Sequence, residues 1–221
     1  MSFTVDFHVH TIYSYDSLNR PKTIIKKAGQ KGLDAVVVLD HNTIKGGVQT
    51  VALNESEVLV IPAVEVRTDI GHIIGLFVRK EIEATEYHAV IDQIHKQGGL
   101  VMLPHPYHKH DLKEGTCELL DLIEINNART TVKNNQLAEK LAKRYNVAGV
   151  SGSDAHFPWE IGRCVTIFDE TPSTREELVN IILNGKRTHR NQLTGKINIV
   201  ISQLIKYMRK PTSILRRLGL K

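Results

Sequence analysis

The stretch FTVDFHVHT, residues 3–11, combines a short apolar run with two closely spaced histidines. This pattern predicts a β-strand over residues 3–8. Side chains alternate across a strand, so Asp6, His8 and His10 should share one face. Two histidines at positions i and i+2 can hold one metal ion from that face. A pair of exposed polar residues on an edge strand would have the same spacing.

Further candidate ligands follow, or begin, other short apolar runs along the chain. A strand delivers its last side chains to one rim of a sheet or barrel, so ligands that are distant in sequence can converge there. The predicted ligands, in chain order, are His8, His10, Asp16, His41, Glu65, His72, His105, Asp154 and His156. Imidazole and carboxylate donors without thiolate suit Zn²⁺, Mn²⁺ or Fe²⁺.

Each of these residues is weak evidence alone, because an ordinary structural role is available to it. An aspartate in a loop, such as Asp16, usually caps the backbone, and a histidine such as His72 is more often a core residue. Their joint occurrence is informative, since a solvated surface predicts no link between strand ends and ligand types. We therefore expect a hydrolase with several metal ions, in which Asp40 orients a ligand ring.

The neighbours of two predicted ligands favour a built site. His105 lies between two prolines, which stiffen the backbone and fix the direction of the imidazole. The small residues Gly152 and Ser153 precede Asp154, and they would let the backbone approach a site closely.

Strand and helix patterns alternate along the chain, which predicts an α/β architecture with a mainly parallel sheet. Helical patterns open at Pro21, recur from Tyr87 and from Leu137, and include a capping-box spacing at Thr174 and Glu177. The predicted strands span residues 3–8, 35–39, 58–64, 72–78, 100–103, 122–125 and 147–150, with an eighth at 164–168.

Length and composition agree with one soluble domain. The 221 residues suffice for a full core, and 41% hydrophobic with 24% charged residues is ordinary for a globular protein. Two cysteines give no disulfide framework, and a first strand at Phe3 leaves no room for a signal peptide. We therefore expect a cytoplasmic protein, with apolar runs too short to span a bilayer.

The net charge of +5 conceals an asymmetry between the two ends of the chain. Residues 178–221 contain ten Lys/Arg and no Asp/Glu, which leaves 19 basic and 24 acidic residues elsewhere. We expect a barrel domain over residues 1–195 and a basic, helical segment over 196–221 that packs its apolar side on the barrel. The alternative is recruitment of RNA or anionic lipid through Lys206, Arg209, Lys210, Arg216 and Arg217.

The motifs HxHTxxSxD, DH, a glutamate, a histidine-led aliphatic strand, HP and SDAH occur in this order. They resemble the polymerase and histidinol phosphatase (PHP) domain superfamily over residues 5–167. The resemblance implies a distorted (β/α)7 barrel with three divalent ions at the C-terminal rim of its strands. The first ion would bind His8, His10, Glu65 and Asp154; the second Glu65, His72 and His105; the third Asp16, His41 and His156. Asp16 replaces a histidine that some members have.

Three divalent ions against three carboxylates leave the site positive, which favours a phosphate dianion. A metal-bound water has a pKa of roughly 7, so hydroxide would attack without a side-chain nucleophile. We expect hydrolysis of a phosphomonoester, nucleotide or short oligonucleotide. Arg129, Arg163 and His108 are candidates for contact with the substrate phosphate.

Two other functions are compatible with the sequence. A PHP fold can serve as a non-catalytic nucleic-acid-binding or assembly module, and the basic segment would suit that role. A weaker alternative is metal-assisted hydrolysis of a carbon–nitrogen or carboxylic ester bond, which some histidine-rich barrels perform.

Overall fold

The computed structural model describes residues 2–108, 110–112 and 115–209. Within these residues, nine strands form one sheet in the order β7-β6-β5-β4-β3-β2-β1-β8-β9. The strands are β1 (Phe3–His10), β2 (Ala35–Leu39), β3 (Leu59–Arg67), β4 (His72–Leu76), β5 (Leu100–Leu103), β6 (Leu122–Asn127), β7 (Ala148–Gly152), β8 (Cys164–Phe168) and β9 (Arg187–Asn191). The helices of this part of the chain are α1 (Pro21–Gln30), α2 (Lys45–Ala52), α3 (Tyr87–His95), α4 (Val132–Tyr145), α5 (Arg175–Asn184) and α6 (Lys196–Arg209).

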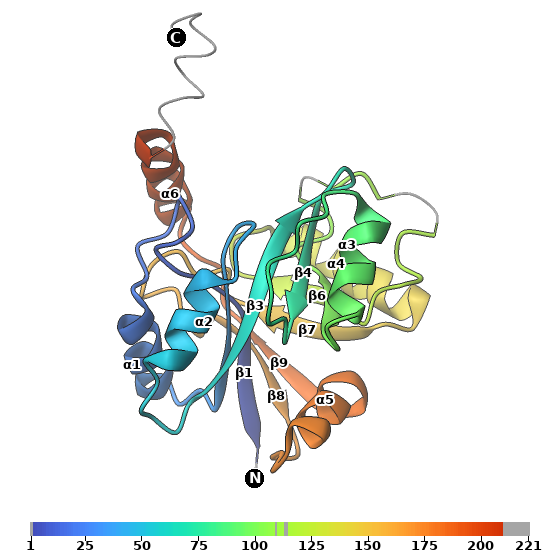
Figure 1. Ribbon diagram of the computed structural model, residues 1–221, viewed down its shortest axis with the longest axis horizontal. Helices are drawn as coiled ribbons and strands as arrows, with labels where there is room; N and C mark the ends of the chain where they lie inside the picture. The colour runs from blue at the N-terminus through green and yellow to red at the C-terminus, as the bar shows by residue number, and fades with distance from the viewer. Residues whose placement is uncertain (1, 109, 113–114, 210–221) are drawn as a thin grey trace, which may run out of the picture.

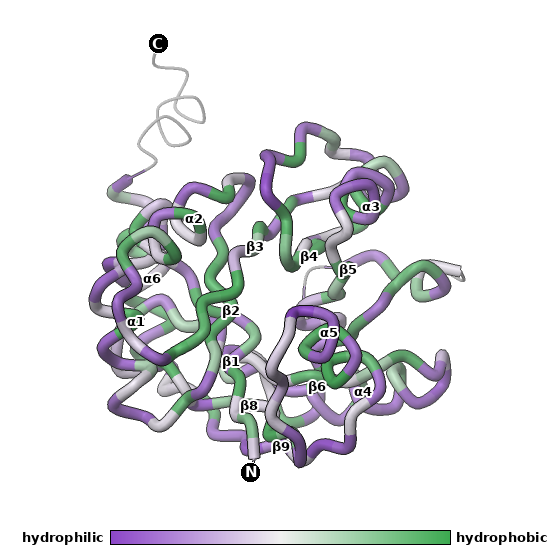
Figure 2. The backbone as a smooth tube through the Cα atoms, turned by 60° about the horizontal axis from the view of Figure 1, so that its bottom comes forward, coloured by the Kyte–Doolittle hydropathy of each residue, from purple (hydrophilic) through white to green (hydrophobic). Residues whose placement is uncertain are grey.

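The sheet curls into a nearly closed barrel (Figures 1 and 2). An isolated parallel bridge joins Val9 of β1 to Ala155, just beyond β7. Its hydrogen bonds run from the His10 amide to the Ala155 carbonyl (3.0 Å) and from the Ala155 amide to the His8 carbonyl (3.1 Å). The α/β barrel expected from the sequence is therefore confirmed, and its closure brings the last residues of β1 and β7 together.

Only part of the sheet is parallel, which corrects the expectation of a mainly parallel sheet. Strands β1–β2–β3 and β5–β6–β7 pair in parallel, whereas β4 runs antiparallel to both β3 and β5. The reason is the short connection from Thr68 to Gly71, which leaves no room for a crossover helix. As a result, His72 at the start of β4 lies at the same rim as the end of β3, opposite Arg67.

Strand β8 extends the sheet antiparallel to β1, and β9 in turn pairs antiparallel to β8. The eighth strand was predicted, but β9 was not, because its sequence RTHRN lacks any apolar pattern. It forms through its register with β8, from Cys164–Asn191 to Phe168–Arg187.

Local sequence signals explain where several helices begin and end. Pro21 occupies the first turn of α1, as predicted. The Thr174 hydroxyl accepts from the Glu177 amide (3.1 Å) and so caps α5, which confirms the predicted capping signal. Helix α4 ends at Tyr145, and the next residue, Asn146, adopts a left-handed conformation with φ 53°.

The hydrophobic core has an inner part and outer parts. Inside the barrel, residues such as Phe7, Val37 and Met102 pack together with Leu178 and Ile182 of α5. Helix α5 thus lies across the end of the barrel at which β1 begins (Figure 2). Outside the barrel, α1 packs on β1 and β2, and α3 packs on β4 and β5. The other end of the barrel is left for polar side chains.

Helix α6 contradicts the expectation that its apolar side packs on the barrel. Its buried residues are the polar Asn198 and Ser202, whereas Ile197, Leu204 and Met208 are exposed. Lys210, Arg216 and Arg217, expected to recruit a partner, lie outside the described residues. None of the described helices has the length and apolar content needed to span a membrane.

Candidate metal centre

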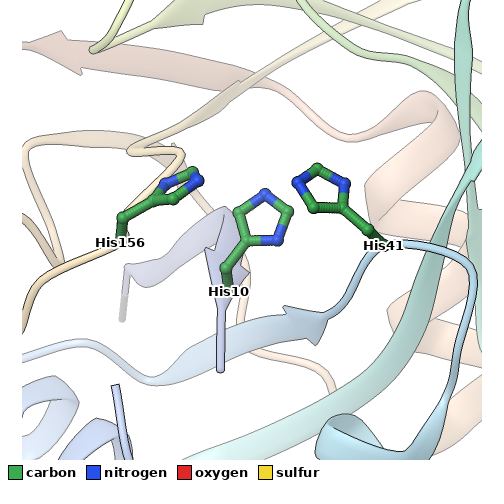
Figure 3. A group of neighbouring side chains, drawn as sticks. All are labelled: His10, His41 and His156. Carbon is green, nitrogen blue, oxygen red and sulfur yellow. The ribbon is translucent and has the colours of Figure 1, made fainter. Parts of the chain in front are cut away.

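All the predicted ligands meet at one rim of the barrel. They come from the end of β1, the loops after β1, β2, β5 and β7, the end of β3 and the start of β4. Except for the fully buried His8, they line one cavity of about 320 Å³. Figure 3 shows the imidazoles of His10, His41 and His156 close together, although these residues are widely separated in sequence. The structure thus brings together the whole ligand set that the sequence suggested.

The carboxylate of Glu65 is the centre of this cluster. Its Oε2 lies 2.8 Å from His41 Nδ1 and 3.6 Å from His10 Nε2, and its Oε1 lies 3.0 Å from His72 Nδ1 and 3.3 Å from His105 Nε2. Both oxygens are buried, yet neither accepts a well-aligned hydrogen bond from a described residue. A buried carboxylate in this condition needs a cation, because burial of an unpaired charge is costly.

The charges around Glu65 affect its pKa more than its burial does. Burial alone would raise the pKa of Glu65, but the imidazoles of His72 and His41 hold that pKa well below its ordinary value. The same reasoning applies to Asp154, whose pKa is lowered by His8 and His10 against the effect of burial. Both carboxylates are therefore ionised and available as ligands.

A second group of donors surrounds the end of β1. His8 Nε2 lies 3.1 Å from His10 Nε2. Asp154 Oδ1 lies 3.6 Å from the first nitrogen and 3.4 Å from the second. Two ring nitrogens that face each other with a carboxylate alongside form a site for a shared cation.

Hydrogen bonds on the far side of three rings fix their tautomers. His8 Nδ1 donates to Glu124 Oε1 (3.0 Å), and His156 Nδ1 donates to the Asp154 carbonyl (2.8 Å). His10 Nδ1 lies 3.1 Å from Ser14 Oγ, which itself donates to Asp40 Oδ1 (2.6 Å). In the neutral form of each ring the proton is on Nδ1, so Nε2, which faces the cavity, is the atom that could bind a metal. Asp40 thus orients a ring, through Ser14.

Asp16 completes a third group. Its Oδ1 is buried without a hydrogen bond from a described residue, 3.5 Å from His41 Nε2 and 3.4 Å from His156 Nε2. Burial would raise the pKa of Asp16, but His156 and His41 lower it. In the described part of the chain, donor atoms close enough to share an ion occur in the sets His10–His41–His156, His8–His10–Glu65, His8–His105–Asp154 and Glu65–His72–His105. These nitrogen and oxygen donors fit divalent ions of the Zn²⁺, Mn²⁺ and Fe²⁺ type.

Two of the ligands adopt strained backbone conformations. His105 and Asp154 have φ values of 31° and 51°, in the left-handed region that residues other than glycine seldom adopt. The close approach predicted at Gly152 is real, because a Cβ there would lie 2.4 Å from the Cβ of His8. The segment after β7 is held by Asp6, which accepts from the Ser153 amide (2.8 Å) and hydroxyl (2.6 Å).

Several site residues were not predicted. Glu124, buried in β6, accepts from His8 and from the His105 amide (2.8 Å), and it also lies 3.0 Å from Asn127 Nδ2. A carboxylate within the apolar run LIEI was the available signal. Tyr15 and Lys206 line the cavity, and the latter comes from α6, whose position no local pattern predicts.

The predicted phosphate contacts have different surroundings. His108 lines the cavity. Arg129 also lines it, but its Nη1 donates to both carboxylate oxygens of Glu160 (3.0 Å each) and its Nη2 donates to Ser202. Arg163 is not among the lining residues, and its Nη1 donates to the Leu193 carbonyl (3.0 Å). The geometry therefore gives no support to the role expected for Arg163.

Comparison with known families and proteins identifies the family to which this sequence is similar. The family model described as PHP domain matches residues 6–152, and the model described as PHP-associated matches residues 132–186. The uncharacterized protein MJ0417 of Methanocaldococcus jannaschii is 30% identical over an alignment of 246 positions. The alignment covers 95% of this chain and 99% of that protein.

Solved structures share the fold at low sequence identity. A two-domain protein from Bacteroides vulgatus, described as containing a predicted PHP-like metal-dependent phosphoesterase, has a TM-score of 0.75 and 17% identity, covering 92% of this chain and 70% of that chain. The lesion-specific endonuclease PfuEndoQ from Pyrococcus furiosus has a TM-score of 0.59 and 17% identity, covering 86% and 58%.

Proposed function

Because this chain belongs to the PHP domain family, we propose that it is a metal-dependent phosphoesterase. The observation that carries this proposal is the carboxylate of Glu65, buried and without a well-aligned hydrogen bond from the described residues, with four imidazoles around it. Burial of an unpaired carboxylate is costly, and bound cations would offset that cost. A phosphate ester is the substrate that a positive, oxygen-binding site favours.

We assign three divalent ions to this rim. His8, His10, Glu65 and Asp154 would hold the first, Glu65, His72 and His105 the second, and Asp16, His41 and His156 the third. Ions bound there would lower the pKa of water to roughly 7 and polarise the phosphoryl group. Zn²⁺, Mn²⁺ and Fe²⁺ all suit these donors.

The chain's own residues then position the substrate. His108, in the segment after β5, and Lys206, in α6, both line the cavity. Lys206 supplies a cation for the phosphate. A second cavity of about 630 Å³ shares Tyr15, His41, His72 and Lys206 with the first. The smaller cavity suits a phosphomonoester, and the two together leave room for a nucleotide or short oligonucleotide. Both cysteines are free and buried, which supports a reducing, cytoplasmic compartment.

The test is a hydrolysis screen on protein loaded with Mn²⁺, Zn²⁺ or Fe²⁺, using phosphomonoesters, nucleotides and short oligonucleotides. His10→Ala and Asp154→Ala should lose bound metal and at least about a hundredfold in activity. His88→Ala is the matched control, because His88 is exposed on α3 and should leave both properties unchanged.

Absence of hydrolysis with every metal and every ester would refute the proposal. Salt-dependent nucleic-acid binding that persists without metal would then favour the non-catalytic module. Hydrolysis of amides or carboxylic esters in place of phosphate esters would favour the remaining alternative.

A further inference from the structure

Helix α6 exposes its apolar side to water, whereas an ordinary surface helix buries that side and exposes its polar one. Its buried residues are the polar Asn198 and Ser202. Its exposed residues form an aliphatic face, with exposed fractions of 70% for Ile197, 57% for Leu204 and 80% for Met208. Val200, Ile201 and Tyr207 belong to the same outward face, which follows helical spacing. We name this set of six residues the α6 outer face.

Specific hydrogen bonds fix this orientation. Trp159 Nε1 donates to Asn198 Oδ1 (3.3 Å), and Arg129 donates to Ser202. At the other end of the helix, Arg209 Nη1 donates to the Ser17 carbonyl (2.9 Å). The polar side is therefore the docked side, and rotation of the helix to bury its aliphatic side would break these bonds.

The loop after β1 runs beside α6 (Figure 1). This loop contains Ser17, which binds Arg209, and it exposes Ile12, Tyr13 and Leu18 by 40%, 42% and 43%. The six side chains of the α6 outer face alone form an exposed apolar stripe along one helix, and such a stripe marks a surface that a partner covers.

The charges near α6 indicate which kind of partner binds the α6 outer face. Residues 196–221, which are α6 and the sequence that follows it, contain seven Lys/Arg and no Asp/Glu. A second copy of the chain would bring the same positive charge to the contact. A nucleic acid would require cations on the outer face, where the side chains are aliphatic instead. An anionic lipid surface accepts both the aliphatic side chains and the surrounding cations.

We propose that the α6 outer face binds the surface of an anionic phospholipid membrane. Ile197, Leu204 and Met208 enter the boundary between headgroups and acyl chains, and the positive charge that the sequence carries from residue 196 onward attracts the lipid phosphates. On its other side α6 contributes Ile199, Gln203 and Lys206 to the wall of the metal-centre cavity, so membrane binding brings that cavity close to the lipid surface.

The experiment uses the full-length, metal-free protein, so that its result is independent of hydrolysis. Flotation with phosphatidylcholine vesicles, with and without phosphatidylglycerol, measures binding. Trp159, the only tryptophan in the chain, is 54% exposed and contacts α6, so its fluorescence reports binding directly. The expected result is flotation with anionic vesicles only, a blue shift of Trp159 and weakening by added salt.

Leu204→Glu should reduce binding to anionic vesicles by at least about tenfold. Val132→Glu is the matched control, because Val132 on α4 is 56% exposed against 57% for Leu204, and it should bind like the wild type. Equal melting temperatures would verify that both variants fold.

Three results would overturn the proposal. The first is absence of vesicle binding at low salt. The second is vesicle binding that Leu204→Glu leaves unchanged. The third is self-association by light scattering, or RNA binding, that Leu204→Glu abolishes while vesicles are not bound; this would assign the face to a second copy or to nucleic acid.

Discussion

At the scale of single residues, the site depends on groups that orient ligands as much as on the ligands themselves. The ligand types could be predicted from sequence because they stand beside apolar runs, at positions such as His105 and Asp154. Glu124 could not be assigned, because its role follows from the approach of β6 to His8, which no local pattern specifies.

Glu124→Gln should weaken metal binding by about 10- to 100-fold, since the carboxylate that holds His8 Nδ1–H and raises the basicity of the ring is lost. Calorimetric titration with Mn²⁺ measures the change. Glu118→Gln, an exposed change, serves as control and should leave the affinity as it is. Equal affinities in all three proteins would show that Glu124 does not tune His8.

His189 makes stability depend on pH. Burial, aided by the charge of Arg187, lowers the pKa of His189 from 6.5 to about 4. The unfolded chain therefore takes up a proton between pH 6.5 and pH 4 that the folded chain does not, so this residue's contribution is lost as the pH falls through that window. After allowance for solvent screening of the partly exposed ring, the loss is about 1–2 kcal/mol.

Urea unfolding at pH 7 and pH 4 tests this. His189→Asn retains a polar group near Ser151 but does not titrate, so its stability should fall less than that of the wild type. The metal ligands titrate equally in both proteins, so the difference isolates His189. Parallel pH profiles would contradict the prediction.

At the scale of elements, sequence patterns located strands better than they oriented or partnered them. The apolar run of β4 was evident, but its direction follows from a short connection to β3. Strand β9 was missed because it is polar, and the docked side of α6 was missed because hydrogen bonds rather than apolar burial determine it. Helix position therefore depends here on buried polar pairs.

The Arg129–Glu160 ion pair holds the segment after β7 near α6, and the side chains are 8% and 0% exposed. Arg129→Met should lower the free energy of unfolding by about 3 kcal/mol, because Glu160 is left as a buried charge with its other donors alone. Urea unfolding measures the loss. Lys143→Gln breaks the exposed pair with Glu139 and should cost less than about 0.5 kcal/mol. Equal losses would mean that Arg129 has no structural role.

At the scale of the whole molecule, we expect metal binding and folding to be coupled. The metal-centre rim brings together residues from β1 and from the segment after β7, which are far apart in sequence. Its carboxylates are buried close together and lie beside imidazoles. Cations that bind only the folded chain stabilise it, by about 4 kcal/mol for a site at a thousandfold excess over its Kd.

Removal of metal with a chelator should therefore lower the melting temperature by roughly 10 °C for a chain of this size. Differential scanning calorimetry with and without Mn²⁺ measures the shift. Glu65→Gln should show a smaller shift between the two conditions, because it lacks the carboxylate that two of the three assigned ions share. A metal-independent melting temperature in the wild type would contradict the coupling.

The most direct test of the metal centre is anomalous diffraction from crystals of the Mn²⁺-loaded protein. Three anomalous peaks are expected at the rim, each in contact with its assigned ligands and two of them sharing the Glu65 carboxylate. Crystals soaked to saturation that show no peak beside Glu65 would contradict it.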